Sequence, residues 1–150
     1  MPEIKVIEAM RIAGYVLETS METLVAENNI PAFWEGIFKS DKGQKLQGLM
    51  GRCKAMYGVS NMRNDNDMSY MVGVALEPEA EPLAEMTLFE VPAGKYVVVE
   101  VAMEELQKGY EEGFGWITEQ GHEVAHGMSF EFYPEDFDQT MRLGIYLPVK

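Results

Sequence analysis

The hydrophobic positions of the chain alternate along some segments and recur at helical spacing along others. An extended segment rich in Val, Ile and Tyr covers Lys5–Thr19, and we interpret its Ala13-Gly14 dipeptide as a bend or bulge. Apolar residues then recur every three or four positions over 31–39, where Pro31 suits the first turn of a helix. Several glycines interrupt residues 40–53, so we expect no more than a brief helical turn there.

A β-hairpin is predicted next. Two alternating segments, Ala55–Met62 and Met68–Leu76, flank the polar turn formers Arg63–Asp67. The following stretch, Glu77–Pro82, holds two prolines and three glutamates, which is typical of a linker.

The second half repeats this order. A strand is predicted over Leu88–Val101 with an interruption at Pro92-Ala93-Gly94, and a helix over 103–119 that ends at Gly121. Glycines inside this helix predict either close packing on the sheet or a bend. The last two strands are predicted over Met128–Tyr133 and Met141–Val149. The turn Pro134–Asp136 joins them.

Each half is therefore expected to be strand, helix, strand, strand, over about residues 1–78 and 83–150. Two such pseudo-symmetric units predict a single α+β domain over residues 1–150, with one antiparallel sheet and two helices on one of its faces. The internal pseudo-twofold is expected to create a cleft where the halves meet, and clefts between repeated units are favoured ligand sites.

A carboxylate on the strand at 128–133 is the main candidate for binding chemistry. Side chains alternate along a strand, so Phe130 and Phe132 share one face while Glu131 lies on the other. If the phenylalanines pack beneath the helices, Glu131 points into a cleft on the opposite face. The aromatic residues that could surround it are Tyr57, Tyr146, Trp34, Tyr110 and Trp116.

A carboxylate among aromatic rings suits an organic cation. Burial raises the pKa of such a group, and a cation about 4 Å away offsets the cost by roughly 4 kcal/mol at an effective dielectric of about 20. Each aromatic face adds about 0.5–2 kcal/mol. Alternation alone also permits Glu131 to be a solvated residue on an open sheet face.

Charge and composition exclude several classes of partner. The 25 acidic and 12 basic residues leave a net charge of −13, a field that repels nucleic acid and anionic lipid. No apolar run approaches the roughly 20 residues that cross a bilayer, and the N-terminus lacks a signal-peptide pattern. With the single Cys53, these features predict a cytoplasmic protein without nucleic-acid or membrane partners. The 12 methionines are consistent with core packing or with an adaptable binding surface.

Metal, cofactor and thiol chemistry are not predicted. His122 and His126 are four residues apart, but glycines bracket them and no third ligand is evident. Cys53 lies between Arg52 and Lys54, which lowers a thiol pKa, yet it has no convincing histidine partner. We therefore predict no metal, no cofactor and no catalytic residue.

Several segments resemble the GyrI-like family, the effector-binding domains of bacterial multidrug-responsive transcription activators. They are Val91–Tyr96, Trp116, Ser129–Phe137 and Ile145–Lys150, in this order. The resemblance implies the doubled fold and a cleft in which Glu131 meets cationic ligands. It also implies that Tyr57, in the Met56–Val59 strand entry, lines the cleft.

The resemblance has two departures and leaves three functions open. Where many relatives have an acid before the last strand, this chain has Arg142 and Gly144, and no helix-turn-helix segment precedes the domain. We therefore expect a stand-alone module that senses or sequesters a cationic, amphipathic or aromatic ligand, with regulation through a protein partner. The alternatives are a hydrolase of electrophilic small molecules that uses Glu131, and an acidic protein-interaction module of the gyrase-inhibitor type.

Overall fold

The structure is a computed structural model that describes residues 2–23, 29–50, 54–64, 66–125 and 127–150. Cys53, Asp65 and His126, which entered the sequence predictions, lie outside the described residues. One antiparallel sheet of eight strands organises the fold, in the order β1-β6-β8-β7-β3-β4-β2-β5. The α+β class predicted from the sequence is confirmed.

The strands and helices follow the predicted order. In the first half the elements are β1 (Glu3–Ile7), β2 (Met10–Ser20), α2 (Ile30–Phe38), α3 (Asp41–Leu49), β3 (Met56–Met62) and β4 (Asp67–Ala75). In the second half they are β5 (Thr87–Val91), β6 (Gly94–Ala102), the 3-10 helix η1 (Met103–Glu105), α4 (Leu106–Glu119), β7 (Met128–Tyr133), α5 (Phe137–Thr140) and β8 (Arg142–Val149).

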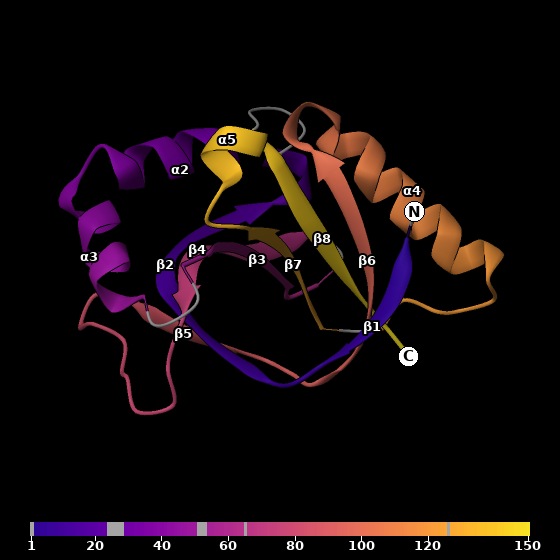
Figure 1. The fold of residues 1–150 in the computed structure, drawn as a ribbon, viewed down its shortest axis with the longest axis horizontal. Helices are drawn as coiled ribbons and strands as arrows, with labels where there is room; N and C mark the ends of the chain where they lie inside the picture. The colour runs from indigo at the N-terminus through magenta and orange to yellow at the C-terminus, as the bar shows by residue number, and fades with distance from the viewer. Residues whose placement is uncertain (1, 24–28, 51–53, 65, 126) are drawn as a thin grey trace.

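The two halves exchange their outer strands. β1 pairs with β6, and β5 pairs with β2, so that Ile7 lies opposite Gly94 and Met10 opposite Val91 in one continuing register. Figure 1 shows the result, a sheet that curls strongly, with the helices along its outer side. α2 and α3 lie at one end of this row, α4 at the other, and α5 between them (Figure 1).

The interruption of the first long strand lies earlier than predicted. β1 and β2 separate at Glu8-Ala9, which lies opposite Pro92-Ala93 between β5 and β6. The interruption predicted at Pro92-Ala93-Gly94 is thus present at its first two residues, and Gly94 begins β6. Ala13-Gly14 lies inside β2, so its interpretation as a bend was wrong. A Cβ on Gly14 would lie 2.0 Å from the carbonyl oxygen of Val72, so this glycine permits close approach of β2 and β4.

Helix α3 is longer than the brief turn predicted for residues 40–53. The Ser40 hydroxyl accepts a hydrogen bond from the backbone N–H of Lys42 and caps the helix. Leu46 is fully buried in a cluster with residues of β4, and Gly43 allows the helix to approach the Phe38 ring. Tertiary packing thus outweighs the helix-breaking tendency of the glycines.

Helix α4 packs closely on β6 and β8, one of the two alternatives that its glycines predicted. A Cβ on Gly109 would lie 2.5 Å from Cγ1 of Val101, and one on Gly113 would lie 2.8 Å from Cδ1 of Leu147. Ile117 is buried on the same face. The helix ends before Gly121, which has a φ of 76° as predicted for its stop.

The sheet is buried on both faces. On its outer face, β6 and β8 contribute one cluster beneath α4, and β4 contributes another beneath α2 and α3. On its inner face, the curl brings together a third cluster that includes Ile12, Val59, Tyr96 and Phe130. Phe130 packs in this inner cluster, so its neighbour Glu131 faces the outer side of the sheet.

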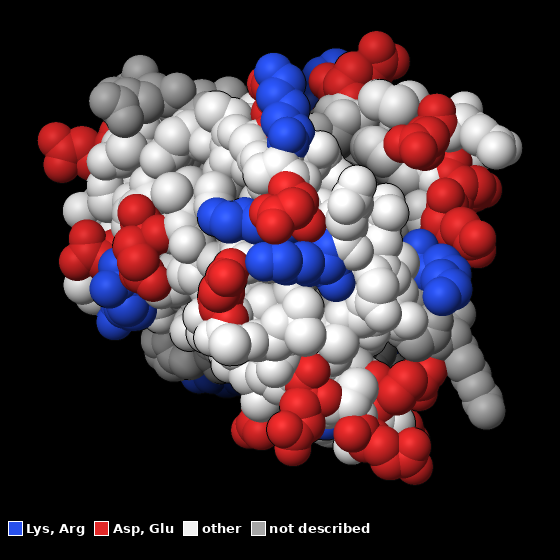
Figure 2. All heavy atoms as spheres, turned by 90° about the vertical axis from the view of Figure 1, so that its left-hand side faces the viewer, with Lys and Arg blue, Asp and Glu red and all other residues white. Residues whose placement is uncertain are grey.

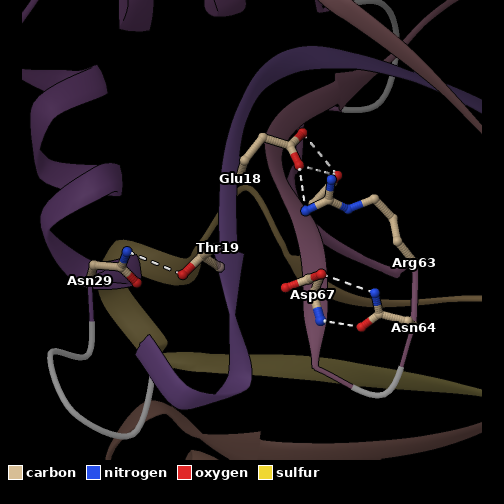
Figure 3. Close-up of polar contacts among 7 residues, drawn as sticks. Glu18, Thr19, Asn29, Arg63, Asn64 and Asp67 are labelled. Carbon is tan, nitrogen blue, oxygen red and sulfur yellow. Dashed lines mark hydrogen bonds and ion pairs between the residues drawn. The ribbon is translucent and has the colours of Figure 1, made fainter.

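The β3–β4 hairpin is held by side-chain contacts at its turn (Figure 3). Oδ1 of Asn64 accepts the backbone N–H of Asp67 at 2.7 Å, and Nδ2 of Asn64 donates to Oδ2 of Asp67 at 2.9 Å. Close by, Arg63 forms an ion pair with Glu18 of β2 at 3.0 Å (Figure 3). These contacts fix the register of β2, β3 and β4, the strands on one side of the site.

Charges on the face over α3 are mixed. Figure 2 shows basic side chains lying among acidic ones, without a continuous basic stripe on this face. Lys45 of α3 forms ion pairs with Asp41 and Glu85. Within the described residues, no helix has both the length and the hydrophobicity needed to cross a bilayer.

Candidate functional site

A cavity of about 1560 Å³ opens on the outer side of the sheet, where the two halves meet. Residues of α2, α4 and α5 line its walls, and Figure 1 shows α2 and α4 on opposite sides of α5. The central strands β3, β4 and β7 form the floor. The cleft predicted between the halves is therefore present, and it lies on the helix side of the sheet.

The floor of the cavity is a ladder of residue pairs from β3 and β7. Met56 lies opposite Tyr133, Gly58 opposite Glu131, and Ser60 opposite Ser129. Because side chains alternate along strands, these three pairs all face the helices. Glu131 belongs to the middle pair and is the acidic residue of the three pairs, and it is only 8% exposed.

Three tyrosine hydroxyls surround the Glu131 carboxylate. Those of Tyr70 and Tyr133 donate to Oε1 at 3.2 Å and 2.7 Å, and that of Tyr110 donates to Oε2 at 2.5 Å. The indole Nε1 of Trp34 donates in turn to the Tyr70 hydroxyl at 2.9 Å. Four elements, α2, β4, α4 and β7, thus converge on one carboxylate.

Burial and hydrogen bonding act on this carboxyl in opposite directions. Burial raises the pKa of Glu131, and the tyrosine hydroxyl donors lower it by a smaller amount, so the net shift is upward. Burial, followed by the nearby charge of Glu131, raises the pKa of Tyr70, Tyr110 and Tyr133. The three hydroxyls therefore stay protonated and act as donors to the carboxylate.

Gly58 makes room for this arrangement. A Cβ at this position would lie 2.2 Å from the Tyr70 hydroxyl and 3.1 Å from Oε1 of Glu131. A side chain of any kind on Gly58 would therefore displace the Tyr70 hydroxyl. Glycine inside a strand is the sequence signal for such a close approach.

Aromatic and methionine side chains make up most of the apolar walls. Trp34 stacks at 6.1 Å on Phe38 and meets the Tyr133 ring edge-on at 4.9 Å. Seven of the 12 methionines line the cavity, namely Met21, Met50, Met56, Met62, Met68, Met103 and Met141. Core packing, one of the two interpretations of the methionines, applies to Met68, which belongs to a core cluster, and to Met71, which is fully buried on the inner face.

The charged residues of the lining are predominantly acidic. Within the lining that the structure describes, they are Glu111, Glu131, Glu135 and Asp138, against one basic residue, Lys54. Among the described residues, the ion pairs do not involve Glu131, so no basic side chain neutralises it. No group of three metal-ligating side chains occurs in the described part of the chain.

Of the aromatic residues predicted to surround Glu131, the structure brings Trp34 and Tyr110 to it. Tyr57 and Tyr146 lie on the other face of the sheet, where they line a separate cavity of about 110 Å³. Trp116 lies on α4 outside the lining of the large cavity and stacks at 6.2 Å on His122. The expected grouping of these three residues around Glu131 was therefore wrong.

The error arose from the face assigned to the phenylalanines. Phe130 and Phe132 pack with Tyr57 on the inner face of the curl and not beneath the helices. The alternation was correct, and Glu131 does face a cleft, but on the side of the helices. Because the curl buries the inner face, apolar residues alone do not reveal the direction of the helices.

Three further residues contribute to the site and were not among the predicted site residues, namely Tyr70, Tyr133 and Gly58. Tyr133 carried a signal, since it shares a strand face with Glu131. Gly58 also carried one, as a glycine inside a strand. Tyr70 reaches Glu131 from β4, across β3, and no local pattern indicates that contact.

Comparison with solved structures finds the same fold in other proteins. SAV2435, solved bound to tetraphenylphosphonium, has 22% identity and a TM-score of 0.80, covering 100% of this chain and 94% of its own. A transcription regulation protein of Staphylococcus aureus MU50 has 20% identity and a TM-score of 0.80, covering 100% and 98%. The integron cassette protein VCH_CASS2 of Vibrio cholerae has 18% identity and a TM-score of 0.74, covering 99% and 95%.

Comparison at the level of sequence identifies the family. No curated protein matches the chain. The family model of Cass2, the integron-associated effector binding protein, matches residues 3–149. This match, together with the shared fold, confirms the resemblance to GyrI-like effector-binding domains. The chain belongs to the Cass2 family of integron-associated effector binding proteins.

Proposed function

We propose that the chain binds bulky organic cations in the cavity between α2 and α4, with Glu131 as the counter-charge. Small-molecule binding follows from membership of an effector-binding family. The charge of the ligand and the role of Glu131 are the proposal. One observation carries it, namely a carboxylate 8% exposed at the floor of an apolar cavity, without an ion-pair partner among the described residues.

The energetics favour a cation over a neutral molecule of the same shape. An ionised carboxylate is costly in such a site, and the three tyrosine donors offset only part of that cost. A cation about 4 Å away contributes roughly 4 kcal/mol at an effective dielectric of about 20. The ring faces of Trp34 and Tyr133 add about 0.5–2 kcal/mol each where the cation lies over them.

The size and composition of the cavity favour ligands of varied shape. Its volume of about 1560 Å³ exceeds the roughly 300–1,000 Å³ typical of drug-sized sites. Methionine side chains adapt readily to different ligand surfaces. Tetraphenylphosphonium, the ligand of SAV2435, is a bulky aromatic cation, and this supports the same class of ligand here. We propose a sensing or sequestering role for the chain on this basis.

A fluorescence titration tests the proposal. Trp34 lies in the cavity wall and Trp116 lies outside the lining, so a Trp116→Phe variant leaves Trp34 as the reporter. We expect methyltriphenylphosphonium to bind at micromolar concentrations, about −8 kcal/mol. The neutral, similarly shaped triphenylphosphine oxide should bind at least tenfold more weakly. Equal affinities for the two compounds would show that charge plays no part.

Cation binding should also depend on pH. Burial holds the pKa of Glu131 above its ordinary value, so the carboxyl is protonated at a higher pH than a solvated glutamate. We expect cation affinity to fall about tenfold per pH unit below that raised pKa and to level off above it. Titrations between about pH 5 and 8 measure this, with triphenylphosphine oxide as the control whose affinity should not change.

A further inference from the structure

A pair of serine hydroxyls on the cavity floor lies next to Glu131 and remains without an assigned role. Ser60 and Ser129 are directly opposite each other on β3 and β7, and both line the cavity. Neither hydroxyl has a hydrogen-bond partner among the described residues. In the described part of the floor, by contrast, the hydroxyls of Tyr70 and Tyr133 both donate to the Glu131 carboxylate.

The position of this pair relative to Glu131 follows from the ladder. Ser129 is two residues before Glu131 on β7, and Ser60 is two residues after Gly58 on β3. Two residues along a strand return to the same face after roughly 6–7 Å. The next floor residue beyond the serines is Met62, which is 40% exposed, so the pair lies between the buried carboxylate and the exposed end of the floor.

Unpaired hydroxyls in an apolar cavity have a chemical consequence. Each serine hydroxyl offers one donor and can accept as well. A purely apolar ligand that covers both would strip them of water and leave them unsatisfied, which is unfavourable. A ligand with a hydroxyl, ether or carbonyl oxygen at this level would satisfy them.

We infer that Ser60 and Ser129 form a polar subsite that selects cations carrying a hydrogen-bonding oxygen roughly 6–7 Å from the charged centre, the two-residue rise of a strand. The inference rests on the proposed binding of a cation beside Glu131. It narrows the ligand class from lipophilic cations in general to cations with a second, neutral polar group at a defined distance.

Two matched probes test the subsite. Trimethyl(4-methylbenzyl)ammonium and trimethyl(4-hydroxybenzyl)ammonium differ in one para substituent, which lies about 6–7 Å from the nitrogen, near the two-residue strand rise. We expect the wild type to bind the hydroxyl probe about three- to tenfold more tightly than the methyl probe. In Ser60→Ala/Ser129→Ala this preference should vanish, with affinity for the methyl probe unchanged or higher.

The control is Ser69→Ala. Ser69 is a buried strand serine outside the cavity lining, and its hydroxyl bonds to Glu18. This variant should keep the full preference for the hydroxyl probe. Equal affinities in the wild type, or a preference that survives in the double variant, would overturn the subsite while leaving cation binding intact. If the wild type binds neither methyltriphenylphosphonium nor either of the two probes, the proposed function is overturned, and the subsite with it.

Discussion

Replacing Glu131 by glutamine should lower the affinity for methyltriphenylphosphonium by roughly 100-fold, about 2.7 kcal/mol. The change removes the negative charge and keeps the shape of a side chain that is 8% exposed among three tyrosine hydroxyls. Affinity for triphenylphosphine oxide should change little, because that compound carries no charge. Calorimetric titration of both proteins with both compounds measures the difference.

The glutamine variant is expected to fold. Its amide can donate to the tyrosine hydroxyls, which also accept hydrogen bonds. Because the pKa of Glu131 is raised in the folded protein, stability falls as the pH rises from the ordinary glutamate pKa through the raised pKa, and glutamine avoids this loss. The variant should also lose the pH dependence of binding. A variant that keeps both the wild-type affinity for the cation and its pH dependence would exclude Glu131 as the counter-charge.

Replacing Gly58 by alanine should destabilise the protein by about 2–3 kcal/mol. The new Cβ would lie 2.2 Å from the hydroxyl of Tyr70, a side chain only 1% exposed that has little room to move. The clash would also pull the Tyr70 hydroxyl away from Glu131, so cation affinity should fall. Urea denaturation measures the first effect and titration with methyltriphenylphosphonium measures the second.

A double variant identifies the atom responsible. Tyr70→Phe removes the hydroxyl and should cost about 1–2 kcal/mol for its lost hydrogen bonds. Gly58→Ala/Tyr70→Phe should then cost clearly less than the sum of the single changes. Gly115→Ala is the control, since a Cβ there meets no atom within 4 Å, and it should not destabilise the helix. If the destabilisation of the double variant equals the sum of the two single changes, the Tyr70 hydroxyl is not the reason that position 58 requires glycine.

The sequence contains enough information to predict the element order and the position of Glu131 in a cleft. The alternation around Phe130 and the turn formers between β3 and β4 are local signals, and the structure agrees with both. The face toward which Glu131 points was not predictable in this way. That face depends on the curl of the whole sheet, which gives Phe130 and Phe132 an apolar environment away from the helices.

The residues that line the site were harder to predict, again because they depend on the curl of the whole sheet. Tyr57 and Tyr146 were predicted as cavity residues from strand alternation, and Tyr57 also from the family resemblance. The register places Tyr57 opposite Phe132 and Tyr146 opposite Phe130, on the inner face. Tyr70 reaches the carboxylate from a strand that does not adjoin β7, a contact that exists only in the assembled sheet.

The exchange of outer strands between the halves also has a consequence for how the protein folds. The β3–β4 hairpin joins residues close together in the chain, whereas the β1–β6 and β2–β5 ladders pair Glu3 with Val98 and Gly14 with Thr87. Loop-closure entropy must be overcome before such distant pairings stabilise anything, so they form slowly. The floor of the cavity also depends on a long-range ladder, because β3 pairs with β7 and sets Gly58 opposite Glu131. We therefore expect the floor to form after the β3–β4 hairpin.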